Sequence, residues 1–553
     1  MAGSKDSASR LGLSLHARDG RKYDQVIALT QGNINESLQY YYDINSEALK
    51  FDVKVKGAIR AQLQGEILAP TVELIDEDNN DKALYCLTFD RGSKYITFVQ
   101  EDPEDDNSRY VPQSQDASGW KLAFEVNFGL SKLTSVPENI REQINKPGDY
   151  SVSQLIVIFG TADTLTFNWE RSTIKLKGND AIADARTAFK LFVDRWLTAT
   201  KMRDEPAKHN VLGYAVTTPD PTAIELAAPS FPPTSVRLQT INHRPNGDAS
   251  QGSTGSDFNA FLFTEMCGNR EMITSDLPWS GDFFYESIGG TLLMSKSIFF
   301  DDYISKALAP INIMGKRAAN EMALRLIGDR LGPWAISDNE SDADNNEFQV
   351  DGKNLRHSWD RRRSHPWQES RILTMTAHFH TEVSTHVWML NSNSFIFRRW
   401  LKFESTIEGN VVDPIFQKYS AGTLRLSMTA TCTADSIFTM SSVEATGKLD
   451  IDVENKAPVI DAQVQPNHDG PVPSALSAVG LGDLLNIGAD DVKSKIRGAL
   501  ESTARDSAEV GNSLQEAVNN QGKFVFPGGG TFDMKDPLFT NDGDLIMGLV
   551  YRK

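Results

Sequence analysis

Cysteine is scarce in this sequence, with 3 residues among 553. Cys86, Cys267 and Cys432 are too few and too far apart for a disulfide framework, and no pair has the spacing of metal ligands. We therefore expect each thiol to be buried in a hydrophobic core.

Long hydrophobic runs are also missing. No stretch reaches the roughly 18 uncharged apolar residues of a transmembrane helix. Residues 1–22 form a polar N-terminal tail without the apolar segment of a secretory signal. The sequence therefore predicts a protein that is cytoplasmic as synthesised and has no transmembrane segment. Export without a leader and peripheral contact with a membrane stay open.

Positive charge is in deficit. The chain has 56 Lys and Arg against 74 Asp and Glu, which gives a formal net charge of −18. Sequence-independent binding of nucleic acid needs a basic surface that displaces counterions, so we expect no nucleic-acid partner. Glycine and proline, with 39 and 23 residues, are too few for a disordered or collagen-like chain.

Familiar catalytic motifs are absent as well. The sequence has no nucleophile elbow, no phosphate-binding P-loop and no H-E-x-x-H zinc motif. The acidic segment Ser337–Glu347 has part of the spacing of a calcium loop, but Glu347 replaces the required glycine and Lys353 the bidentate glutamate. These absences favour a protein without enzymatic activity and without a cofactor, although catalytic groups assembled from distant residues stay open.

The dominant positive signal is an alternation of apolar and polar residues, which predicts half-buried β-strands. It is clearest in Trp120–Leu130, Leu373–Phe379 and Leu424–Cys432. The number and length of such segments predict large, mostly antiparallel sheets with one apolar face each. We expect Phe124, Val126 and Phe128 to lie on such an inner face and to line a ligand site.

Three long helices are expected among the strands. One has its apolar face on Ile182–Leu197, and a second covers Tyr303–Leu331 with an interruption at Pro310. The third, Asp490–Asn520, is about 46 Å long at 1.5 Å per residue and has a face of small residues. A helix of that length needs a long surface, and a sheet is the expected partner.

Five of the nine histidines lie between His357 and His386, which makes this the densest group of candidate site residues. His378 and His380 share one face of a strand, and Glu382 is in register with them. They are weak candidates for metal ligands because no third, distant ligand is apparent. Ordinary solvent-facing side chains are the favoured interpretation, since this face is opposite the apolar one.

Arginines are concentrated in the same region. Arg361, Arg362 and Arg363 precede a His-Pro-Trp segment, and Arg371 follows shortly after. An anionic lipid headgroup is one interpretation of this basic group. A basic surface loop that balances acidic neighbours is the favoured alternative.

Four segments carry a resemblance to a known family: Tyr23–Leu29, Ile34–Leu38, Leu293–Ile311 and Phe524–Tyr551. A strand leads into a short helix with the pattern I-N-x-x-L, and a long helix precedes a terminal strand. With these segments in this order, the sequence resembles the TULIP-type (tubular lipid-binding) proteins. Among them it is similar to the OrfX and forty-seven-kilodalton accessory proteins of clostridial neurotoxin gene clusters.

The resemblance implies an α+β, mostly β fold in which long curved antiparallel sheets wrap around long helices. It divides the chain, after the tail, into TULIP-like halves at residues 23–230 and 231–553, the second ending in the helix near 490–520 and a terminal strand pair. It also implies non-enzymatic binding of a lipid or other amphipathic ligand in an apolar tube. Partner proteins from the same gene cluster, in a toxin-like or secreted assembly, belong to the same expectation.

Two other functions stay open. The same sheets with cores filled by side chains would form a structural or protein-interaction module. Alternatively, the cavity would be the reaction chamber of an enzyme, with His378 and His380 as its acid–base groups. Co-purified lipid would distinguish a lipid-binding protein from a filled module.

Overall fold

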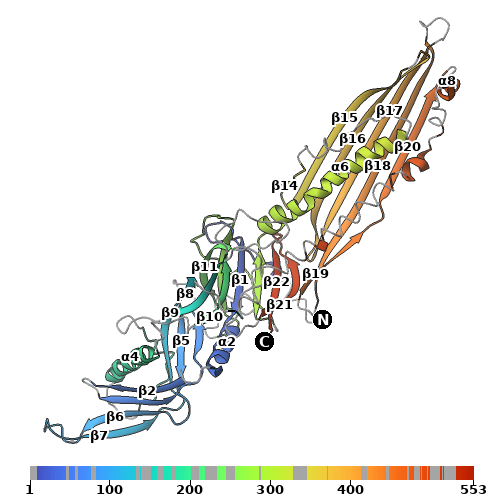
Figure 1. Cartoon of the computed structure of the whole chain (residues 1–553). Helices are drawn as coiled ribbons and strands as arrows, with labels where there is room; N and C mark the ends of the chain where they lie inside the picture. The colour runs from blue at the N-terminus through green and yellow to red at the C-terminus, as the bar shows by residue number, and fades with distance from the viewer. Residues whose placement is uncertain are drawn as a thin grey trace. The chain divides into compact units, whose positions relative to one another are not determined.

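The structure is a computed structural model, and it describes most of the chain (Figure 1). The described residues are 9–44, 49–56, 60–75, 82–132, 138, 151–158, 166–176, 182–200, 211–217, 233–244, 256–285, 288–327, 346–369, 371–412, 420–443, 448–469, 472–478, 486, 488–494, 496–497, 511–512, 515 and 531–552. The acidic segment Ser337–Glu347 lies outside them except at its last two residues.

The chain forms two compact units. Unit 1 comprises Met1–Ser295, Val443–Lys448 and Asn520–Lys553, and unit 2 comprises Lys296–Ser442 and Leu449–Asn519. Antiparallel pairings link the strands of all four described sheets, which confirms the mostly β, α+β class. The division into TULIP-like halves at residue 231 stays a prediction.

A six-stranded sheet forms the centre of unit 1. Its order is β11 (Pro233–Ile241), β12 (Ala260–Cys267), β1 (Gln25–Thr30), β13 (Gly290–Met294), β22 (Leu545–Arg552) and β21 (Thr531–Phe539). Every residue of β1, β12 and β13 is buried. Leu13 and Leu15, in the segment before β1, are buried in the same core.

Two further sheets complete unit 1. One has the order β10 (Val211–Thr217), β9 (Ser151–Ile158), β8 (Lys121–Lys132), β5 (Lys82–Thr88) and β4 (Thr71–Leu74). The other has the order β2 (Lys50–Val55), β3 (Ala61–Glu66), β6 (Lys94–Gln100) and β7 (Tyr110–Asp116). The helices of unit 1 in the described residues include α2 (Gln31–Ile44) and α4 (Ile182–Ala199). On α4, Trp196 stacks on Phe51 with ring centroids 5.8 Å apart, as its predicted apolar face requires.

Unit 2 is built on one sheet of unusually long strands. Its order is β14 (Gln349–Asp351), β15 (Asn354–Glu369), β16 (Leu373–Asn391), β17 (Ser394–Val412), β18 (Ser420–Val443) and β19 (Lys448–Asn455), and β20 (Val459–His468) also pairs with β18. Strands usually have about 5–6 residues. At about 3.3 Å per residue, the 19 residues of β16 extend for roughly 60 Å.

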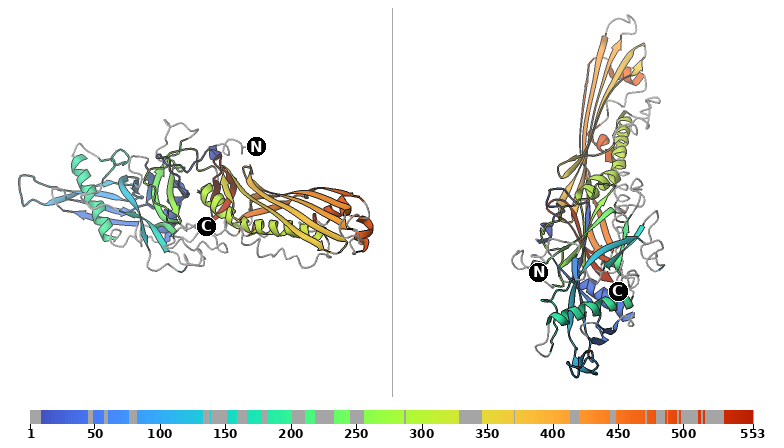
Figure 2. Two further views of the ribbon diagram at one scale, coloured as in Figure 1. Left: turned by 90° about the horizontal axis from the view of Figure 1, so that it is seen from above. Right: turned by 90° about the vertical axis from the view of Figure 1, so that its left-hand side faces the viewer.

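Helices cover one face of this sheet. The π-helix η4 (Ser297–Ile304) continues into α6 (Ser305–Ile327), which runs along the long strands (Figures 1 and 2). The expected interruption at Pro310 is wrong, since α6 continues through it. Gly315 brings α6 close to the sheet: a Cβ atom there would lie 3.3 Å from Cδ of Arg399 and 3.4 Å from Cγ1 of Val383.

Only the beginning of the helix expected at Asp490–Asn520 is well described. Residues 489–494 and 496–497 are helical, and Val492 and Ile496 are buried against Leu401 and Phe403 of the sheet. Most of the remaining helix lies outside the described residues. The short helix α8 (Val472–Ala478) packs on the other end of the same face through Val472 and Leu476.

The three thiols are free and buried, as expected. Burial raises the pKa of Cys432 to about 11. Among the described residues, no helix combines the length and the apolar character that crossing a membrane requires.

Candidate functional site

The sheet of unit 2 has an apolar and a polar face, and β16 shows both. Alternate residues such as Leu373, Met375 and Val383 are buried in clusters with α8 or α6. The residues between them, including His378 and His380, are exposed or half-buried. The alternation predicted from the sequence is therefore confirmed, and it places the histidines on the polar face.

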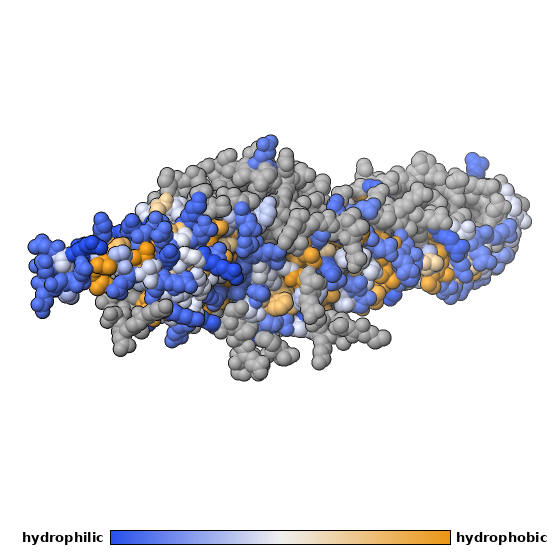
Figure 3. Space-filling view, turned by 90° about the horizontal axis from the view of Figure 1, so that it is seen from below, coloured by the Kyte–Doolittle hydropathy of each residue, from blue (hydrophilic) through white to orange (hydrophobic). Residues whose placement is uncertain are grey.

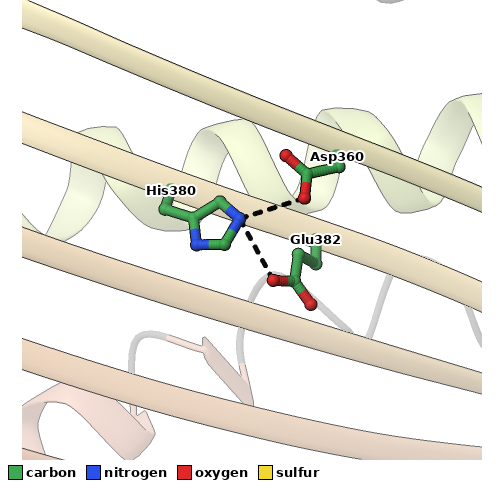
Figure 4. A group of neighbouring side chains, drawn as sticks. All are labelled: Asp360, His380 and Glu382. Carbon is green, nitrogen blue, oxygen red and sulfur yellow. Dashed lines mark hydrogen bonds and ion pairs between the residues drawn. The ribbon is translucent and has the colours of Figure 1, made fainter.

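Three side chains meet on this polar face. Asp360 of β15 is opposite Glu382 of β16, and His380 precedes Glu382 by two residues on the same strand. The Nε2 atom of His380 lies 3.2 Å from Oδ2 of Asp360 and 3.1 Å from Oε1 of Glu382 (Figure 4). One ligand atom from each residue lies within 4.8 Å of the other two. We call Asp360, His380 and Glu382 the carboxylate–histidine group.

Strand β17 adds a third carboxylate and an ammonium group. Oε2 of Glu404 lies 2.9 Å from Nδ1 of His380, and Nζ of Lys402 lies 3.0 Å from Oε1 of Glu404. The hydrogen bond to Glu404 raises the pKa of His380, and the charges of Asp360 and Glu382 act in the same direction. The same bond, together with one to Lys402, holds the pKa of Glu404 below its usual value.

The structure brings together two of the three residues that the sequence singled out. His378 is not in the carboxylate–histidine group; its Nδ1 atom lies 2.7 Å from Oγ of Ser364. The sequence reasoning missed Asp360 and Glu404, which lie 20 and 24 residues from His380 along the chain. The sequence indicated only that Asp360 and Glu404 belong to neighbouring strands. It did not indicate the strand register that brings them beside His380.

The arginines are divided between the two faces of the sheet. Arg362 is opposite His380, and its side chain is 76% exposed. Arg361 and Arg363 lie on the other face with Trp359 and are half-buried. All three belong to strand β15 and not to a loop, while their role as a basic group that balances acidic neighbours stays untested. Arg371 is exposed between β15 and β16.

Strand β15 is at the edge of the described sheet over most of its length. The neighbouring β14 pairs only with Asn354–Arg356. The register shifts between Pro366 and Gln368, a site where a proline without an N–H is tolerated. Arg361 and Arg363 therefore lie where the apolar face of unit 2 meets the edge of its sheet.

The predicted lining residues Phe124, Val126 and Phe128 belong to unit 1. They are at most 4% exposed. The ring of Phe124 lies 5.7 Å from that of Tyr85, and the ring of Phe128 lies 4.5 Å from that of Phe261. Side chains surround this face in the described part of the chain. A role in ligand binding stays a prediction.

A buried polar row on the apolar face of unit 2 was not predicted. His357, Thr385 and Arg399 are opposite one another on β15, β16 and β17, and all three are buried. Lys316 of α6 is buried on the same side, with Nζ 5.8 Å from the centre of the Trp359 ring. Burial lowers the pKa of His357, and the charge of Lys316 adds to the effect.

These features define a mostly β protein with a long two-faced sheet in unit 2. No protein-family model matches the sequence, and no curated protein matches it.

Solved structures do match. The chain is similar to P47 of Clostridium botulinum E1, with 10% identity, a TM-score of 0.44, and coverage of 96% of this chain and 99% of that one. It is also similar to P47 from Clostridium botulinum A2, with 11% identity, a TM-score of 0.44, and coverage of 95% and 97%. For a lipopolysaccharide binding protein the identity is 9%, the TM-score 0.22, and the coverage 96% and 99%. Two of these matches are therefore P47 proteins, which share their name with the forty-seven-kilodalton accessory proteins that the sequence resembles.

Proposed function

We propose that this protein is non-enzymatic and binds a lipid or other amphipathic molecule along the apolar face of the unit 2 sheet. In this proposal the sheet wraps around its helices as in TULIP-type proteins. The hydrocarbon part of the ligand lies between the sheet and the helices, and an anionic head lies at the edge of β15.

The observation that carries the proposal is the position of Arg361 and Arg363. Both are half-buried and share a face with Trp359, Phe379 and the apolar residues beyond them. Arginine side chains combine an apolar stem with a guanidinium that binds carboxylate or phosphate. A strip of apolar side chains bordered by such groups matches the two chemistries of an acidic amphipath.

Partly exposed aromatic side chains on the apolar face support the same proposal. Hydrophobic side chains (orange) reach the surface between hydrophilic ones, as the space-filling view shows (Figure 3). Trp359 and Phe379 are only half-buried, although they lie on the apolar face. A hydrocarbon chain that covered them would gain roughly 25 cal/mol for each Å² of apolar area removed from water.

The alternative of a protein-interaction module with a filled core is favoured by the packing under α8. Leu373, Leu426 and Leu476 have 0% exposure there. This end of the apolar face is therefore filled by the chain's own side chains. If the protein is an accessory protein with binding partners, those partners would bind outside this filled end of the apolar face.

The test has two steps on the purified full chain. The first is solvent extraction followed by mass spectrometry of any co-purified lipid. The second is a titration with fluorescent fatty acids and phospholipids, repeated on an Arg361→Ala/Arg363→Ala variant. Arg362→Ala is the control, because it removes a neighbouring positive charge from the same strand on the opposite face. We expect weaker binding of anionic ligands in the double variant and unchanged binding in the control.

Wild-type protein that yields no lipid and binds none of the probes would reject the proposal and favour the interaction module. Equal binding by the wild type and the double variant would retain the apolar face as the ligand site. It would reject the proposal that Arg361 and Arg363 bind the anionic head of the ligand.

A further inference from the structure

We propose that the carboxylate–histidine group is a binding site for a divalent transition-metal ion, with Zn²⁺ as the favoured ion. The ligands are Nε2 of His380 and one carboxylate oxygen each of Asp360 and Glu382. This inference goes beyond the proposed function, because the site lies on the polar face of the sheet, opposite the face that would bind lipid.

The distances between the donor atoms suit a small cation. Ligands at about 2.0–2.1 Å from a tetrahedral Zn²⁺ are roughly 3.3 Å from one another. Nε2 of His380 lies 3.2 Å from the oxygen of Asp360 and 3.1 Å from that of Glu382. Two edges of the coordination polyhedron are therefore already close to their final length. The third edge, between the oxygens of Asp360 and Glu382, is at most 4.8 Å long and would shorten by rotation of the carboxylates.

The second nitrogen of the imidazole provides independent support. Metal-binding histidines almost always donate their other N–H to a carboxylate or carbonyl, which fixes the tautomer and the ring orientation. Nδ1 of His380 lies 2.9 Å from Oε2 of Glu404, and Lys402 lies within 3.0 Å of the other oxygen of Glu404. When Nδ1 donates to Glu404, the lone pair of Nε2 faces the carboxylates of Asp360 and Glu382.

The charge balance favours a cation. Three carboxylates surround one imidazole, and the described cationic groups nearest to them are Lys402 and the exposed Arg362, whose Nε is 4.0 Å from Asp360. A protonated Nε2 has one N–H, so it can form a well-aligned hydrogen bond with only one of the carboxylates of Asp360 and Glu382. A divalent cation at the same place would bind both carboxylates. Proton and metal therefore compete for Nε2, and binding releases a proton at a pH where His380 is protonated.

Three neighbouring strands hold all the donors. Asp360 lies on β15, His380 and Glu382 on β16, and Glu404 on β17, in continuous register. The side chain of His380 is only 15% exposed, whereas that of Asp360 is 58% exposed. This arrangement leaves the outer side of the ion open to water, as in sites with three protein ligands.

The experiment is calorimetric titration of chelator-treated, full-length protein with Zn²⁺, followed by Co²⁺ substitution and visible absorption spectroscopy. His380→Gln tests the site, and His378→Gln is the control, because it removes an imidazole two residues away on the same face. We expect the wild type and the control to share one binding event that His380→Gln lacks. Glu404→Gln should weaken that event about 10- to 100-fold, as loss of such a partner typically does.

Identical isotherms for the two histidine variants would overturn the proposal. So would wild-type protein that binds no Zn²⁺ and gives no Co²⁺ absorption. Thermal melting of each variant in the presence of chelator tests whether the fold persists. In a folded variant, loss of the Zn²⁺-binding event is due to the loss of a metal ligand. The result is independent of the lipid proposal, since Arg361→Ala/Arg363→Ala leaves every proposed ligand in place.

Discussion

The ammonium group of Lys22 lies 2.6 Å from Oδ1 of Asp544, and 522 residues separate the two along the chain. The carboxylate of Asp544 is fully buried at 0% exposure, whereas Lys22 is 24% exposed. The pair joins the segment before β1 to the turn before β22 within unit 1.

Replacing Lys22 with methionine should therefore destabilise unit 1. The change removes a cation from a buried carboxylate, and hydrogen bonds to charged groups contribute about 1.5–3 kcal/mol. Urea denaturation of the full chain measures the loss. Arg21→Met is the control, because its pair with Asp19 is exposed and such pairs contribute about 0–1 kcal/mol. Equal midpoints for the two variants would contradict the prediction.

Phe124→Ala should lower the free energy of unfolding by about 3–5 kcal/mol, the range for a large aromatic side chain removed from a packed core. Phe124 has 0% exposure and packs against Tyr85 and Phe167. Chemical denaturation measures the change, and Leu191→Ala on the outer side of α4, where Leu191 is 37% exposed, is the control. A small loss with impaired ligand binding would instead identify this face as a ligand lining.

Unit 2 should lose stability below pH about 6.5 because of His357. Burial lowers the pKa of His357, so the folded state binds this proton less readily than the unfolded state. Its stabilising effect is present above the unfolded pKa and is lost as the pH falls. Denaturation midpoints at pH 8 and pH 5 should therefore differ more for the wild type than for His357→Gln. An equal difference in both proteins would show that His357 does not cause it.

His380 should have the opposite effect in the presence of a chelator. Its pKa is raised, so the stabilisation is fully present below about pH 6.5 and is lost as the pH rises through the folded pKa. His380→Gln should be less stable than the wild type at pH 5 and closer to it at pH 9. His378→Gln, whose imidazole contacts Ser364, is the comparison, and a matching profile there would refute the role of His380.

The alternation of apolar residues was sufficient to predict the faces of β8, β16 and β18. Strands β1, β12 and β13 show no such alternation. Both of their faces are buried, so apolar residues are favoured at every position and not only at every second one. The site was only half predictable. His380 and Glu382 share a strand, so their common face follows from spacing alone. Asp360 and Glu404 reach them through the register of two hairpins, which is set by turns and by packing.

The strand order of unit 1 has a consequence for synthesis on the ribosome. Strand β13 is complete about 250 residues before β22, its neighbour in the sheet, has been translated. At 5–20 residues per second, the interval is roughly 10–50 s. During it, one edge of an apolar strand has no β22 to accept its hydrogen bonds, and such edges recruit other chains. We therefore expect nascent unit 1 to depend on a chaperone until translation has passed residue 552, whereas the described strands of unit 2 are all translated by His468.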